Sequence, residues 1–536
     1  MNLIPILFIF LPFLSGIIIF VFKHKTLNYM ALAVQFGLVF LIFRYFPFVH
    51  HLGRHDVVLG GWPSLVGIAL FNDKISLAFI ALGIIMWTIC LIYDWSYRKT
   101  DSSFLFFLLL LEGIFFGVIQ TRDFYTLFLF IEISTILSTI LVAYKKDGYS
   151  LRAALYYLLF NSVGMLLFLL GVFILYRLTG TLNMDLIAER IQPLRNLFSF
   201  HLAIIFILTA AGVKSAFFPV YNWLPKAHGA APASISALLS GLLVKSGVYV
   251  FFRVNQTFEL QEYYQFFLII GFITALSGVC FAISQNDIKQ ILAFSSVSQV
   301  GLIIMGLSYM DTEIYYGGLI HLINHAFSKA LLFLGVGVII NKYNERNVTH
   351  IRGVFANFPS VSALMIVAML SITGAPFFNG FIGKSLIAYG FTDNKLFSLL
   401  IYFVNIGTAA AYIKMAQIFF GKHQGHRGKD FHNVFAMSIL AFLCIIFGIL
   451  YIDIFSFLFG IDISYITLLH IEKWISYFVL LLLGYLINRL FVQKEAAFLT
   501  HMRHFSLSFE NSNILFVCFI SIMLLWHFTI IKGYLL

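Results

Sequence analysis

Five lysines lie inside long apolar stretches of this chain, at Lys214, Lys245, Lys329, Lys384 and Lys414. A helix that crosses a membrane needs about 20 mostly apolar residues, and these stretches reach that length. A lysine near the centre of such a helix costs roughly 2.5–3.5 kcal/mol on insertion scales. The five charges are therefore expected to face water, protons or one another inside the protein. This pattern predicts a membrane protein that conducts charge.

The composition leaves no room for a soluble domain. The chain has 536 residues, of which 61% are hydrophobic and only 11% are charged, whereas soluble proteins carry about 25% charged residues. We therefore expect one all-α polytopic membrane protein with about 14–16 transmembrane helices. The predicted cores are residues 4–22, 28–43, 77–94, 104–120, 124–143, 154–176, 199–217, 234–252, 264–284, 291–309, 316–340, 361–388, 397–419, 434–452, 474–491 and 513–531.

The net charge of +11 is explained by the orientation of the chain in a membrane rather than by nucleic-acid binding. If the N-terminus lies outside, the inner loops hold 18 of the 34 Lys and Arg residues and the outer loops hold 11, with five inside spans. An excess of positive charge on the cytoplasmic side is typical of membrane proteins. We therefore predict a multi-pass protein of the plasma (inner) membrane with its N-terminus outside, and no nucleic-acid partner.

Neither a cleaved signal peptide nor a cofactor site is expected. The first 20 residues have no positive region and no small-residue cleavage site, so we interpret them as the first span. The four cysteines are isolated in apolar segments and form no C-x-x-C pair, so neither an iron–sulfur cluster nor a zinc site is expected. No phosphate-binding loop is present, and we predict no NADH, flavin or metal.

Two predicted spans are interrupted, and each carries a lysine. The seventh span passes Lys214 and then meets Pro219, which removes a backbone donor and breaks the helix. In the twelfth span, Gly374 and Pro376 precede Lys384. Irregular backbone at membrane depth survives only where it is buried in protein or lines a wet cavity. Broken helices at corresponding places of two halves are typical of transporters built from inverted repeats.

His321, His325 and Lys329 form a stripe on one helix. Their i, i+4, i+8 spacing places them on one face over a rise of about 12 Å. Histidine titrates near neutral pH. Such a stripe inside an apolar helix can pass protons along bridging water.

Glu132 lies near the middle of the fifth span, and Lys214 is its expected partner. A Glu–Lys pair that opens and closes would be a switch, whereas a permanently closed pair would be structural. Lys245 is a further buried lysine that could bind and release protons. Glu112 is another intramembrane acid, and Lys414 is the lysine most able to extend its amine towards the membrane surface.

At these residues the chain resembles the antiporter-like, proton-conducting membrane subunits. These are the L, M and N subunits of respiratory complex I, the A and D subunits of Mrp-type cation/proton antiporters, and the related subunits of membrane-bound hydrogenases. The resemblance covers about residues 55–420. It rests on LGGWPSLVGIAL, the Glu132 span, KSAFFPVYNWLPKAHGAAPASISALLSGLLVKSGVYVFFR, QNDIKQILAFSSVSQVGL, HLINHAFSKALLFL and GAPFFNGFIGK.

The resemblance implies two inverted five-helix repeats, spans 4–8 and 9–13, with helices 7 and 12 broken. We accordingly divide the chain into N-terminal spans with an extracytoplasmic β-hairpin (1–100), a first repeat (101–255), a second repeat (256–420) and C-terminal spans (421–536). The functional residues that match the family are Glu132, Lys214, Lys245, His321, His325, Lys329 and Lys384. Lys226 stands where the family often has an acidic residue.

The sequence predicts a proton-translocating subunit of a larger complex, which could resemble NADH:quinone oxidoreductase, a hydrogenase or an Mrp antiporter. The expected partners are other membrane subunits, the lipid bilayer and protons, with sodium as a second candidate ion. The subunit would have no redox site of its own and would serve as the proton-pumping part of a translocase. The alternatives are a subunit of an inorganic carbon uptake complex and a standalone secondary transporter.

Overall fold

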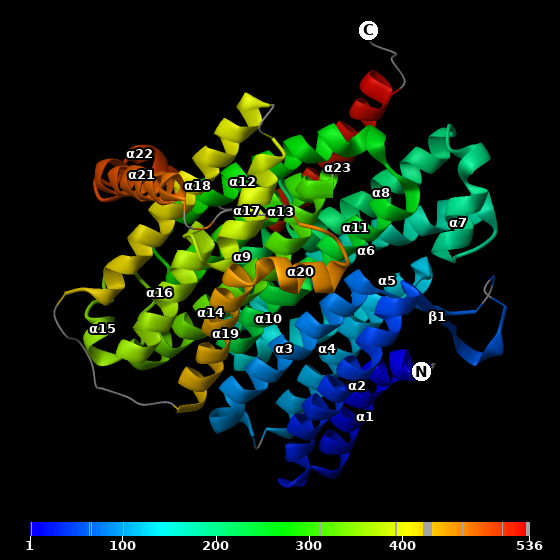
Figure 1. Ribbon diagram of the computed structural model, residues 1–536, viewed down its shortest axis with the longest axis horizontal. Coiled ribbons are helices and arrows are strands. Elements are labelled where there is room, and N and C mark those ends of the chain that lie inside the picture. Colours follow the sequence, from blue (N-terminus) through cyan, green and yellow to red (C-terminus); the bar gives the residue numbers. More distant parts are fainter. Residues whose placement is uncertain are drawn as a thin grey trace.

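The fold is almost entirely helical. The computed structural model describes residues 1, 3–63, 65, 67–99, 101–309, 312–391, 394–421, 431–463, 466, 468, 470–505 and 507–531. Fifteen of the described helices are long and apolar enough to cross a membrane. The predicted segment 361–388 is present as two shorter helices separated by a break. The prediction of an all-α polytopic membrane protein is confirmed (Figure 1).

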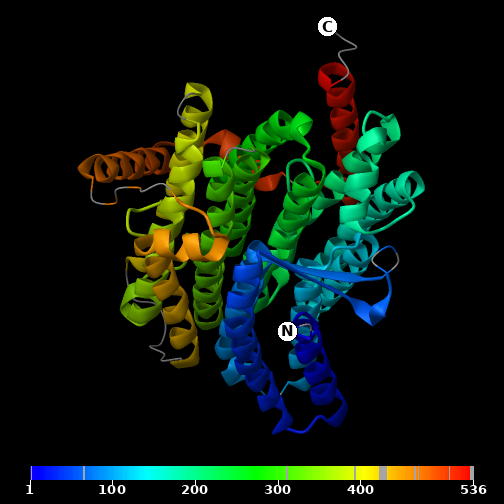
Figure 2. The same cartoon turned by 45° about the vertical axis from the view of Figure 1, so that its right-hand side comes forward.

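The N-terminal helices form one flank of the molecule, with α1 packed on α4 and α2 packed on α3 (Figure 1). The predicted hairpin is present as two antiparallel strands that pair Arg54 with Asp73 and Val58 with Ala69, and it projects from the helices in Figure 2. Asp73 ends the hairpin and forms a capping box with Ser76, which fixes the start of the third helix. The elements are α1 (Ile4–Phe22), α2 (Met30–Leu52), β1 (Arg54–Val58), β2 (Ala69–Asp73), α3 (Lys74–Arg98) and α4 (Ser102–Gln120).

The next group of helices contains the first break. α8 ends at Ser215, and α9 begins at Trp223. Between them Ala216 takes a positive φ of 59° and the Phe218–Pro219 peptide is cis. Trp223 donates its indole N–H to the carbonyl of Val213 at 2.8 Å, which satisfies one of the free carbonyls at the end of α8. The elements are α5 (Phe124–Val142), α6 (Gly148–Thr179), α7 (Met184–Arg190), α8 (Phe198–Ser215), α9 (Trp223–Ala230), α10 (Ala233–Leu238) and α11 (Val244–Phe258).

The second group contains the second break. α16 ends at Thr373, Gly374 follows with φ 88°, and α17 begins at Asn379. Both breaks therefore occur where the prolines and glycines of the sequence predict them. The elements are α12 (Tyr264–Ser284), α13 (Ile288–Ser308), α14 (Thr312–Tyr343), α15 (Val354–Asn357), α16 (Pro359–Thr373), α17 (Asn379–Tyr389) and α18 (Lys395–Ala416).

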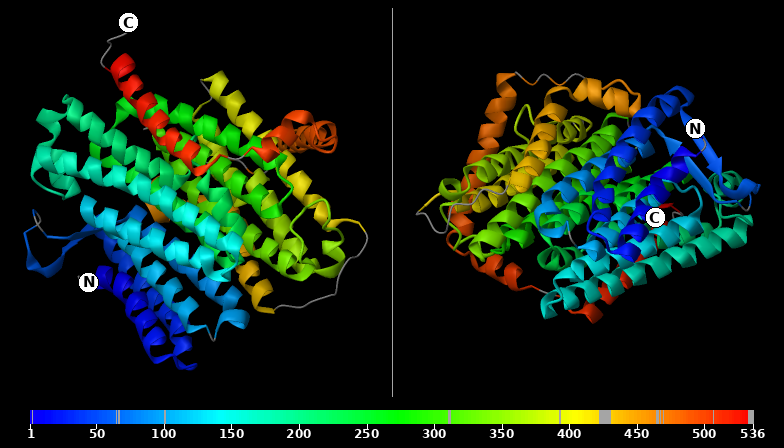
Figure 3. Two further views of the ribbon diagram at one scale, coloured as in Figure 1. Left: turned by 180° about the vertical axis from the view of Figure 1, so that it is seen from behind. Right: turned by 90° about the horizontal axis from the view of Figure 1, so that it is seen from below.

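The C-terminal helices lie on the outside of the molecule. α21 packs on α18, α22 packs on α12, and α23 packs on α8; the red α23 crosses the back of the molecule in Figure 3. Arg503 in α22 donates to the carbonyl of Ser284, the last residue of α12, at 2.9 Å. The elements are α19 (Phe431–Ile449), α20 (Tyr451–Phe459), α21 (Ile471–Ile487), α22 (Ala497–His504) and α23 (Phe509–Trp526).

The protein core lies at the central spans. In the apolar stretch of the span formed by α10 and α11, 100% of the residues are buried. The corresponding share is 94% for α13 and for α14, but only 28% for α21 and for α23. Because lipid does not reach the central helices, they can carry polar side chains at membrane depth.

Short 3₁₀ turns lie at Leu27–Tyr29, Leu59–Gly61, Ala143–Lys145, Gln192–Leu194, Gln261–Tyr263 and Gln417–Phe419, and π-helical turns lie at Leu239–Leu243, Asn488–Val492 and His527–Ile531.

Candidate functional site

Lys214 lies in the last turn of α8, directly before the first break. Its Nζ donates to Thr135 Oγ1 on α5 at 2.8 Å and to Tyr157 OH on α6 at 3.3 Å, and the residue is only 3% exposed. The break turns the chain away after Ser215, so the lysine is free to reach sideways between α5 and α6. The buried amine is therefore held by two hydroxyl groups.

The expected ion pair between Glu132 and Lys214 is not formed. Glu132 lies on α5, where its Oε1 accepts a hydrogen bond from Ser162 of α6 at 2.6 Å. Its Oε2 has no hydrogen-bond partner among the described residues. Glu132 is also partly exposed rather than buried. Its exposure arises because α5 lies at the edge of the molecule, which the sequence of a single helix does not reveal.

Lys245 lies immediately after a π-helical turn, Leu239–Leu243, inside the eighth span. The wider turn shifts the backbone register, and the Nζ of Lys245 donates to the carbonyl of Ser240. Ser240 Oγ in turn lies 2.8 Å from Ser296 Oγ on α13. π-Helical turns often occur at functional sites. This turn was not predicted, since nothing in the local sequence marks it.

The predicted stripe of His321, His325 and Lys329 lies on the continuous helix α14. The ring centroids of the two histidines are 6.2 Å apart, as one-turn spacing requires. His321 Nε2 lies 3.0 Å from Gln299 Oε1 on α13. His325 is 1% exposed, and neither ring nitrogen has a hydrogen-bond partner among the described residues. His325 therefore has both nitrogens available to a proton or to water.

Lys329 continues the stripe and joins three helices. Its Nζ donates to Tyr412 OH on α18 at 2.9 Å and to the carbonyl of Leu292 on α13 at 3.0 Å. Tyr412 OH also lies 3.0 Å from Ser295 Oγ. Ser295 and Gln299 are four residues apart and share one face of α13. Their four-residue spacing is the signal that could have found them from sequence.

Lys384 lies on α17 beyond the second break. Its Nζ donates to the carbonyl of Ile372, at the end of α16, at 2.7 Å. The carboxyl end of a helix carries a partial negative charge that stabilises a cation. Its neighbour Gly383 packs on α14 so closely that an added Cβ would lie 2.6 Å from the Cα of His321. The break thus brings Lys384 to the side of the histidine stripe.

Lys414 differs from the other intramembrane lysines. It lies near the end of α18 and donates to the carbonyl of Ile283 at 2.8 Å and to that of Gln285, at the end of α12. It is 4% exposed, because its amine is covered by the end of α12. Lys414 therefore joins α18 to the end of α12.

His228 is a buried residue to which the sequence assigned no role. It lies on α9, is 0% exposed, and stacks on the ring of Phe333 of α14 with centroids 4.6 Å apart. Neither of its ring nitrogens has a hydrogen-bond partner among the described residues. Its contact with α14 connects the first broken helix to the helix that carries the stripe.

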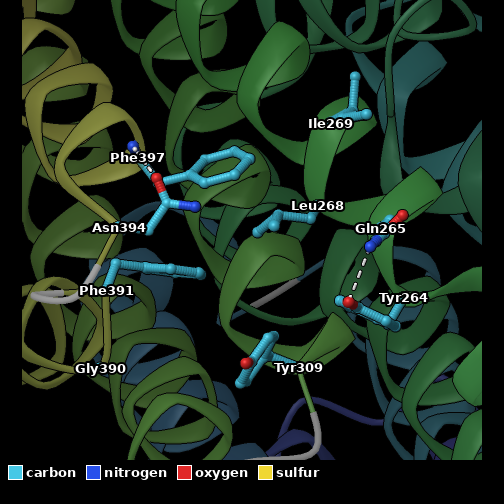
Figure 4. Close-up of a pocket in the computed structure, with 9 residues that line it drawn as sticks. All are labelled: Tyr264, Gln265, Leu268, Ile269, Tyr309, Gly390, Phe391, Asn394 and Phe397. Atoms are coloured by element: carbon cyan, nitrogen blue, oxygen red, sulfur yellow. Dashed lines mark hydrogen bonds between the residues drawn. The ribbon is translucent and has the colours of Figure 1, made fainter.

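A cavity of about 440 Å³ opens beside the far end of α17. Figure 4 shows Tyr264, Tyr309 and Phe391 facing it, together with the amide side chains of Gln265 and Asn394. Gly390, which follows the last residue of α17, also lines the cavity. Lys384 is six residues earlier, a rise of about 9 Å. The cavity therefore lies further along α17 from Lys384.

Comparison with known proteins identifies related sequences. The family pattern described as NADH:quinone oxidoreductase/Mrp antiporter, transmembrane, matches residues 121–410. The D subunit of the Na⁺/H⁺ antiporter of Alkalihalophilus pseudofirmus is 30% identical over 440 residues, which cover 80% of this chain and 88% of that protein. The N subunit of the NADH-quinone oxidoreductase of Desulforudis audaxviator is 32% identical over 343 residues, which cover 62% and 68%.

Two solved structures have a similar fold. A chain of the membrane-bound sulfane sulfur reductase, an archaeal respiratory membrane complex, superposes with a TM-score of 0.80 and 25% identity, covering 85% of this chain and 96% of that one. A chain of the Mrp complex from a Dietzia species gives a TM-score of 0.79 and covers 93% and 99%; at 20% identity it indicates the fold alone.

Proposed function

Because this chain belongs to the NADH:quinone oxidoreductase/Mrp antiporter family of transmembrane subunits, we propose that it translocates protons as one membrane subunit of a larger complex. The observation that carries the proposal is the set of buried amines and imidazoles from Lys214 to Lys384. Such charges are expensive at membrane depth and are retained where they carry out transport.

The proposed route begins at the first break and ends at the second. Protons reach Lys214, pass Lys245 beside the π-helical turn, and enter the stripe at Lys329. Lys329 and His321 lie one turn to either side of His325 on α14, and Lys384 lies beside His321 across Gly383. Water linking these groups would complete the path, because side chains one turn apart are too distant for direct hydrogen bonds.

The exit of the route is proposed at the cavity beside α17. Tyr264, Tyr309, Gln265 and Asn394 offer hydroxyl and amide groups at its wall. These groups are neutral and can form hydrogen bonds with water. With the N-terminus outside, this end of α17 faces the outside of the membrane, so protons leaving Lys384 would be released there.

The proton is the favoured coupling ion because of the chemistry of the side chains. A hard cation such as sodium is bound by carboxylate and carbonyl oxygens. The proposed route instead offers amines and imidazoles, which bind protons and repel metal cations when charged. Sodium is therefore the second candidate, coupled at another membrane component of the complex rather than along this axis.

The partner surface is proposed at α5. Glu132 is partly exposed there, among the exposed apolar residues Leu129, Ile133 and Ile136. A carboxyl group at an apolar edge of a membrane helix is costly to place next to lipid. A neighbouring membrane protein of the complex that packs on this edge of α5 would shield Glu132 from lipid, and it would connect the side chain beside Lys214 to the rest of the complex.

The function is tested by proton uptake into vesicles that contain the assembled complex. Lys329→Met removes a relay amine, and Lys414→Met is the matched control, because it removes a buried amine that binds helix-end carbonyls away from the route. We expect proton uptake to be lost in Lys329→Met and retained in Lys414→Met at matched protein content. Retained uptake in Lys329→Met would overturn the relay.

A further inference from the structure

A buried acid, Glu112, lies outside the proposed route. It is on α4 and is 0% exposed. Its Oε2 lies 2.8 Å from the side-chain amide of Gln35 on α2, and Gln35 lies 3.0 Å from the hydroxyl of Thr88 on α3. These three side chains join three N-terminal helices. No ion pair of Glu112 occurs among the described residues.

Counting donors shows that an ionised Glu112 fits this cluster poorly. With the carboxylate ionised, the amide nitrogen of Gln35 donates to Glu112, and the amide oxygen must accept from Thr88. The single hydroxyl proton of Thr88 would then be required twice, because Thr88 Oγ1 also lies 2.7 Å from the carbonyl of Ile84. The buried charge would have one neutral donor, and Oε1 has no partner among the described residues.

Turning the amide of Gln35 by 180° removes the conflict, since its oxygen and nitrogen occupy the same shape. A protonated Glu112 can then donate its O–H to the oxygen of Gln35. The amide N–H of Gln35 donates to Thr88, and Thr88 donates to Ile84. Each donor is used once, and the remaining oxygen of Glu112 is a neutral acceptor, whose burial costs much less than that of a charge.

The geometry assigns Glu112 as a proton-binding site, a neutral carboxylic acid at the head of the hydrogen-bond chain Glu112–Gln35–Thr88–Ile84. Its ligand is a proton, held apart from the route through Lys214 and Lys384. The chain also has a mechanical consequence. The side chain of Gln35 connects α2 to Glu112 on α4 and to Thr88 on α3. The bound proton therefore helps to attach α2 to α3 and α4.

The test is infrared spectroscopy of the assembled complex near neutral pH in H₂O and D₂O. Wild type should show a protonated-carboxyl C=O band that shifts in D₂O and is absent in Glu112→Gln, a variant whose amide N–H can still donate to Gln35. Gln35→Leu removes the acceptor, so the same band should persist and move to higher frequency, as expected for a carboxyl that has lost its hydrogen bond.

The two variants distinguish a proton-binding site from a structural effect. Identical protonated-carboxyl spectra for wild type and Glu112→Gln would overturn the proposal, because they would mean that Glu112 is ionised. A band unchanged in frequency in Gln35→Leu would also overturn it, since the acid would then not donate to Gln35. Thr88→Val, one bond further along the chain, should shift the band less than Gln35→Leu.

Discussion

Asn324 of α14 and Asn379 of α17 exchange hydrogen bonds across the second break. The side-chain amide of Asn324 donates to the carbonyl of Asn379 at 2.8 Å, and that of Asn379 donates to the carbonyl of Asn324 at 3.3 Å. Ser371 of α16 donates to Asn379 and lies 2.6 Å from Ser328 of α14. Both halves of the broken helix are thus attached to the helix that carries His325.

The first prediction follows from this attachment. Asn379→Ala removes two hydrogen bonds and leaves buried groups without partners, which costs about 1–3 kcal/mol for each group left unsatisfied. We expect a lower thermal unfolding midpoint and a several-fold loss of proton uptake, because Lys384 is no longer held beside His321. Asn357→Ala is the control, since Asn357 donates to Tyr343 at the far end of α14. Unchanged uptake and stability in Asn379→Ala would show that the attachment is dispensable.

The second prediction concerns Lys214, which binds two hydroxyl groups and does not pair with Glu132. Lys214→Ala should reduce proton translocation by about 100-fold or more, as for loss of a proton-transferring group, while assembly persists. Tyr157→Phe removes only one of its two acceptors and should reduce translocation less. The measurement is vesicle acidification with the content of each protein checked by blotting. Normal pumping in Lys214→Ala would remove this lysine from the mechanism.

The third prediction concerns Lys384. Glu should replace it better than Ala, because a carboxyl can bind and release a proton and a methyl group cannot. The Ile372 carbonyl at the end of α16 accepts from the native amine, so a carboxyl there must be protonated to donate. Proton uptake by Lys384→Glu should therefore fall more steeply with rising pH than that of wild type. Equal inactivity of the two variants at every pH would contradict a titratable exit group.

The fourth prediction is that the stripe acts as one unit. The rings of His321 and His325 are 6.2 Å apart, which requires a bridge between them. His321→Ala and His325→Ala should each abolish most proton flux, and the double variant should lose little more. Flux is measured at matched protein levels. Two partial losses that multiply in the double variant would instead indicate independent packing effects.

The fifth prediction concerns the ion pair that joins the hairpin to α11. Burial raises the pKa of Asp73, but the charge and hydrogen bonds of Arg253, 2.7 Å away, outweigh it, so the pKa lies below its usual value. A lowered folded-state pKa stabilises the protein above the unfolded-state pKa, and this contribution is lost as the pH falls through the folded value. Thermal midpoints should therefore decline between about pH 5 and pH 2, and decline less in Asp73→Asn. Parallel declines in both proteins would assign the acid sensitivity elsewhere.

The sequence by itself determined the spans, the two breaks and the helical stripe. Each depends on neighbouring residues: an apolar run partitions into the bilayer, proline removes a backbone donor at Pro219 and Pro376, and a four-residue spacing places His321 and His325 on one face. The intramembrane lysines were also visible in the sequence, since a charge in an apolar run stands out without knowledge of its partner.

Only the tertiary structure decided what those charges touch. Lys214 is held by Thr135 and Tyr157 rather than by Glu132, and Glu132 lies at an exposed edge of the molecule. Lys329 meets Tyr412 of α18, 83 residues further along the chain. These partners depend on how helices distant in sequence pack and on which face of each helix meets protein or lipid. Periodicity within a single span carries no information about that packing.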